Sequence, residues 1–68
     1  MRRIVNASRR DIENTIDAYI FNERNRRLLC RRMLDGVKLE RLAEEFDLSV
    51  RQVNTICAQG FKTVTAHL

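Results

Sequence analysis

Apolar residues recur every three or four positions along most of the chain, a period that predicts α-helices rather than strands. Four segments follow this period, and short polar or glycine-containing stretches separate them. We therefore expect an all-α fold, a small four-helix domain with helices at about 8–21, 22–35, 39–46 and 49–66. Residues 8–68 form this single domain in our interpretation. Residues 1–7 precede it as a basic arm able to touch phosphates, unless they are a disordered end or pack Ile4 and Val5 on the core.

Polar residues and one glycine mark the expected helix boundaries. Ser8, Asn22 and Ser49 are N-cap residues, because their side chains accept hydrogen bonds from free backbone N–H groups of a first turn. Gln52 stands three residues after Ser49, which is the spacing of a capping box. Gly36 ends the second helix, where a left-handed residue is needed.

The first helix carries an apolar stripe formed by Ile12, Ile16, Tyr19 and Ile20. Aromatic residues at helical spacing usually belong to a core, so we expect Tyr19 and Phe21 to be buried. An alternative use of the same stripe is a homodimer interface through helix 8–21.

The fourth helix has an apolar and a polar side. The apolar side comprises Val50, Val53, Ile56, Cys57, Gly60, Phe61, Val64 and Leu68. The polar side comprises Arg51, Thr55, Ala58 and Lys62, with Asn54 and Gln59 at the flanks. Gly60 falls within the apolar stripe, where it would let another helix approach closely. The alternative is that the helix ends at Gly60; the period persists through Val64, which favours continuation.

The third and fourth expected helices meet at a turn of about three residues. Their sequence, LERLAEEFDLSVRQVNTICA at 39–58, resembles the helix-turn-helix motif of bacterial DNA-binding proteins. Ala43 falls where the motif needs a small side chain between its helices. Asp47 replaces the usual left-handed glycine, a conformation that aspartate tolerates better than most residues. The preceding helix ends in Asp35-Gly36, which is similar to region four of sigma factors and to the DNA-binding domain of quorum-sensing response regulators. The resemblance covers roughly residues 22–64.

The resemblance implies that the second motif helix, at 49–59, enters the major groove of double-stranded DNA. Its outward or first-turn residues are the candidate base contacts: Val50, Arg51, Asn54 and Thr55. Arg51 is the leading candidate, since its guanidinium can donate two hydrogen bonds to guanine. The candidate contacts to the DNA backbone are Lys38, Ser49, Gln52, Lys62 and Arg31. Arg31 belongs to the second helix, which is rich in arginine. In the same helix we expect Arg27 to pair with Glu23, four residues before it.

Composition narrows the function further. A chain of 68 residues forms one domain at most, and a net charge of +4 favours an anionic partner. Apolar runs are only a few residues long, so we expect no membrane span and a cytoplasmic protein. Cys30 and Cys57 lack C-x-x-C spacing, and we interpret them as buried free thiols. With one histidine, His67, at the end of the chain, we expect no metal, no cofactor and no enzymatic activity.

The leading hypothesis is therefore a sequence-specific DNA-binding protein, a small bacterial or phage transcription regulator. The alternative is an adaptor, similar to sigma region four, that binds a protein such as RNA polymerase, a recombinase or a packaging component. DNA contact would then be secondary. A polar, arginine-bearing outer face on the fourth helix favours DNA, whereas an exposed apolar patch there would favour a protein partner.

Overall fold

The computed structural model describes residues 8–68, and this part of the chain is helical between its turns, with no strand. Its helices are α2 (Arg9–Tyr19), α3 (Glu23–Met33), α4 (Leu39–Phe46) and α5 (Val50–Ala66). The expected all-α fold is thus confirmed, with boundaries close to the predicted ones. The candidate basic arm, residues 1–7, lies outside the described residues.

The predicted N-caps form the expected hydrogen bonds. Ser8 Oγ accepts from the backbone N–H of Asp11 at 3.0 Å, and Asn22 Oδ1 accepts from Asn25 at 3.1 Å. Lys38 precedes α4 without a side-chain cap. Gly36 adopts a left-handed φ of 69°, two residues beyond the C-cap of α3, so it turns the chain towards α4 as predicted.

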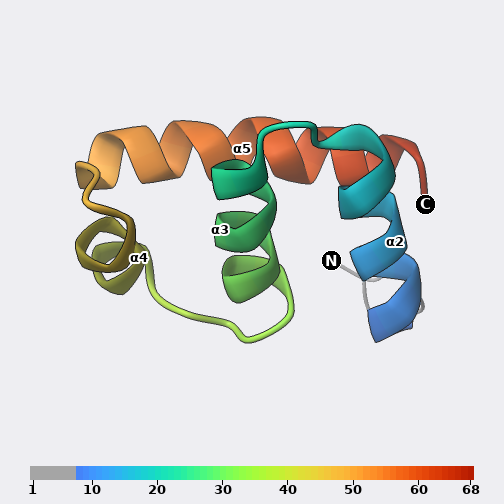
Figure 1. Cartoon of the computed structure of the whole chain (residues 1–68), viewed down its shortest axis with the longest axis horizontal. Helices are drawn as coiled ribbons and strands as arrows, with labels where there is room; N and C mark the ends of the chain where they lie inside the picture. Colours follow the sequence, from blue (N-terminus) through green and yellow to red (C-terminus); the bar gives the residue numbers. More distant parts are fainter. Residues whose placement is uncertain (1–7) are drawn as a thin grey trace.

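The long helix α5 contacts each of the other three helices, which lie side by side along it (Figure 1). Helix α4 packs on the N-terminal half of α5, α2 packs near its C-terminal end, and α3 lies between them. The core accordingly has two clusters. One joins α2, α3 and α5 through Ile12, Ile16, Leu29 and Val64. The other joins α3, α4 and α5 through Leu28, Leu42, Ala43 and Val53.

Helix α5 continues without interruption past Gly60, as its apolar period favoured. Gly60 is buried where α5 crosses α3, and a Cβ placed on it would lie within 3.0 Å of three side-chain atoms of Leu29. Leu29 is itself 1% exposed and has little room to move. The glycine therefore permits the close helix approach that holds α5 against the scaffold.

The end of α2 differs from the sequence prediction. The helix stops at Tyr19, Ile20 is extended, and Phe21 is 82% exposed instead of buried. The reason is tertiary: the guanidinium of Arg26 donates to the carbonyl oxygens of Ile20 and Asp17, which fixes the end of α2 beside the start of α3. Tyr19 is 45% exposed and stacks on His67, with ring centroids 3.7 Å apart.

The apolar stripe of α2 is used within the chain. Ile12 and Ile16 are 4% and 1% exposed and pack against α3 and α5. These two side chains therefore do not form the homodimer surface that was the alternative interpretation of helix 8–21.

Candidate nucleic-acid interface

The turn between α4 and α5 fixes the orientation of the candidate recognition helix. Asp47 is left-handed, with φ 56° and ψ 48°, and the backbone N–H of Leu48 donates to Ala43 at 2.9 Å. Ser49 Oγ accepts from the N–H of Gln52 at 3.1 Å, and Gln52 Oε1 accepts from the N–H of Ser49 at 3.0 Å, so the predicted capping box is formed. Ala43 is 7% exposed in the core between the two helices. The start of α5 is therefore held rigidly.

All four candidate base contacts lie on the surface. Arg51, Asn54 and Thr55 are exposed, and Val50 is 44% exposed. No ion pair or side-chain hydrogen bond engages the Arg51 guanidinium within residues 8–68, so its donors are available to a ligand. The Thr55 hydroxyl donates to the backbone oxygen of Arg51 at 3.1 Å, which leaves its methyl group and its acceptor capacity for a base.

The structure places these side chains on two flanks of α5. One flank borders an open hollow of about 350 Å³ that is lined by Arg24, Leu48, Arg51, Gln52, Thr55 and Ile56. Asn54 lies on the other flank, in a groove shared with Phe61. Arg51 and Thr55 are thus brought together with Gln52, whereas Asn54 points to a different part of the surface.

The candidate backbone contacts are dispersed. Ser49 and Gln52 are exposed at the start of α5, where the capping box occupies the Gln52 amide oxygen and leaves its nitrogen as a donor. Lys38 is exposed at the start of α4. Lys62 is exposed on α5, but about 17 Å along the helix from Arg51. It therefore belongs to the far end of any surface centred on Arg51.

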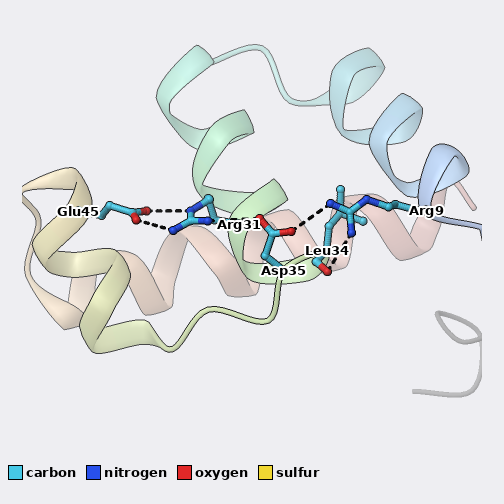
Figure 2. A network of polar contacts seen from close by, with 5 residues as sticks. All are labelled: Arg9, Arg31, Leu34, Asp35 and Glu45. Carbon is cyan, nitrogen blue, oxygen red and sulfur yellow. Dashed lines mark hydrogen bonds and ion pairs between the residues drawn. The ribbon is translucent and has the colours of Figure 1, made fainter.

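Arg31 is engaged within the fold. Its guanidinium binds Glu45 on α4 at 3.0 Å and Asp35 at 3.4 Å, and Asp35 in turn pairs with Arg9 of α2 at 3.0 Å (Figure 2). This chain of charges ties α2 and α3 to α4. Because two carboxylates already compensate its charge, Arg31 is a less suitable phosphate ligand than an arginine without carboxylate partners.

Because of this chain of ion pairs, the free energy of unfolding depends on pH in the acidic range. Hydrogen bonds from Arg9 lower the pKa of Asp35, and those from Arg31 lower the pKa of Glu45. A carboxyl group whose pKa is lower in the folded state contributes stability above its unfolded pKa and loses it as pH falls through the folded pKa. The loss therefore occurs below about pH 4.

We expect Glu45→Gln to lower the melting temperature at pH 7, and this difference from the wild type to shrink as pH falls below about 4 and Glu45 becomes protonated. Melting curves of both proteins across this range measure the effect. Glu44→Gln is the matched control, since Glu44 makes no ion pair in the described part of the chain. A Glu45→Gln deficit that is equal at both ends of the range would contradict the assignment.

The sequence did not single out Arg24. It is exposed at the start of α3 and donates only to the adjacent Asn25, at 3.2 and 3.3 Å. The expected pair between Glu23 and Arg27 is not formed within residues 8–68. A larger cleft beside Arg24, of about 1000 Å³, contains arginines but also Asp17, Glu23 and Glu45. Its mixed charge suits an anion less well than the hollow next to Arg51.

The other flank of α5 is more apolar than its helical wheel predicted. Val50, Phe61 and Leu68 were expected on the buried side but are 44%, 38% and 44% exposed. Val50 and Phe61 lie at the edge of the apolar arc of α5, and Leu68 follows the end of the helix. Phe61 borders a groove of about 430 Å³ whose lining includes Leu29, Met33, Leu39 and Cys57.

Both cysteines are free and half-buried. Burial raises the pKa of the Cys57 thiol, and burial together with the carboxylates of Glu13, Asp17 and Asp35 raises that of Cys30. Both thiols therefore stay protonated near neutral pH, a state unsuited to nucleophilic attack or metal binding.

Comparison with protein-family models, with curated proteins and with solved structures found no match to this chain. Within residues 8–68, no helix combines the length and the apolar character that crossing a membrane requires.

Proposed function

We propose that this protein binds double-stranded DNA in a sequence-specific manner, as a small bacterial or phage transcription regulator, with the start of α5 in the major groove. The observation that carries the proposal is the exposed Arg51 at the rigidly capped start of α5, next to Thr55 and free of carboxylate partners in the described residues. An arginine held at a helix start can donate two hydrogen bonds to guanine O6 and N7. The net charge of +4 supports attraction to the duplex.

Selection of bound sequences from a pool of random duplexes tests this proposal. Sequence-specific binding enriches a short motif, and a palindromic motif would indicate a dimer with two half-sites. Recovery of duplexes without any enriched motif, together with binding that simply weakens as salt rises, would contradict base readout by α5.

A specific observation favours a second candidate, the protein adaptor. The exposed Phe61 and Val50 and the apolar groove beside Phe61 form the kind of surface that a protein partner covers. If the protein is such an adaptor, we expect it to bind neither random duplexes nor duplexes from the selection tightly. The same selection experiment therefore separates the two functions.

A further inference from the structure

The arginines of α3 divide into two groups according to what already binds them. Arg26, Arg31 and Arg32 are engaged in the fold: each guanidinium donates to a backbone carbonyl or to a carboxylate from another part of the chain. Arg24 and Arg27 have no such bond within residues 8–68: Arg24 donates only to its neighbour Asn25, and Arg27 forms no side-chain hydrogen bond or ion pair there. The fold therefore engages three of the five arginines of α3 and leaves Arg24 and Arg27, of which Arg24 lines the hollow next to Arg51.

Arg24 reaches the same hollow as the recognition helix. It lines the open space of about 350 Å³ together with Arg51, Gln52 and Thr55 of α5. No carboxylate from residues 8–68 lines this hollow, although the neighbouring cleft contains several. Two arginines therefore line one solvent-open space together with Gln52, whose amide nitrogen the capping box leaves as a donor.

We infer that this hollow binds one phosphate of the DNA backbone and that Arg24 is its anchor. Guanidinium groups bind phosphate through parallel, charge-assisted hydrogen bonds, and the hollow is open enough to admit a backbone phosphate. Because Arg24 comes from the scaffold helix α3, this contact sets the position of the whole domain on the duplex and so fixes where Arg51 meets the bases. The inference rests on the proposed DNA binding.

Measurement of binding affinity against salt concentration tests Arg24. For a phosphate anchor, Arg24→Ala should weaken binding to selected and to random duplex alike, by roughly tenfold. The slope of log affinity against log salt concentration should fall by about 0.9, the contribution of one phosphate contact. Arg24→Lys should restore most of the slope, since a lysine also binds phosphate as a point charge. The melting temperature should not change, because Arg24 forms no bond to another element within residues 8–68.

Arg10→Ala is the matched control. Arg10 is also an exposed arginine in the second position of its helix, but α2 lies near the opposite end of α5 (Figure 1). A wild-type protein that binds DNA, with Arg24→Ala behaving like Arg10→Ala, would overturn the anchor while leaving the proposed function intact. A loss confined to the selected duplex would also overturn it, because Arg24 would then read a base. A wild type that binds no duplex would instead refute the proposed function.

Discussion

Arg51→Ala is expected to weaken binding of the selected duplex by about 1–3 kcal/mol, with a much smaller loss on random duplex. The physical reason is that a guanidinium meeting guanine O6 and N7 forms two hydrogen bonds that another base pair does not offer. Arg51 has no partner within the described part of the fold, so its removal should leave the melting temperature unchanged. Equilibrium titrations of both duplexes at one salt concentration measure the difference.

Lys62→Ala is the control for this prediction. Lys62 lies on the same outward side of α5 but about 17 Å from Arg51, so its loss removes a positive charge without affecting readout at the helix start. If Arg51→Ala weakened selected and random duplexes equally, Arg51 would be a backbone contact and not a reader of bases.

Gly60→Val is expected to destabilise the fold by about 1–3 kcal/mol. The added side chain must displace Leu29, which is fully enclosed between α2, α3 and α5. Valine is a better helix former than glycine, by less than about 1 kcal/mol, so the two effects oppose each other and the overpacking is larger. Urea denaturation measures the free energy of unfolding.

Ala58→Val adds bulk to the same helix at an exposed position and is the matched control for Gly60→Val. Its cost should be only the lower helix propensity of valine, about 0.5 kcal/mol. If Gly60→Val were as stable as this control, the close crossing of α3 and α5 would be wrong.

Features set by local chemistry were predictable from the sequence. The capping box of Ser49 and Gln52, the left-handed Asp47 and the continuation of α5 past Gly60 follow from residues that are neighbours along the chain or one helical turn apart. The period also identified the buried centre of the apolar stripe in the first and fourth helices, Ile12 and Ile16 in one and Val53 and Val64 in the other.

Features set by distant contacts were not predictable. Phe21 is exposed because Arg26 fixes the end of α2 through carbonyls six and nine residues away. The ion pair of Arg31, a predicted contact to the DNA backbone, with Glu45 joins residues fourteen positions apart along the chain. Which arginines of α3 remain available depends on where carboxylates and carbonyls lie in space, and for this reason the sequence could not single out Arg24. The exposure of Val50 and Phe61 was not predictable, because a helical period does not reveal how wide an arc of the helix the neighbouring helices cover.

The most direct test of sequence reading by α5 is protection of guanine N7, a major-groove atom, against methylation on the selected duplex. The proposed function predicts that the wild-type protein protects at least one guanine of the motif, and that Arg51→Ala abolishes this protection at one position while still binding. If the wild-type protein bound the duplex and protected no guanine, or if Arg51→Ala gave the same pattern, Arg51 would not read the major groove.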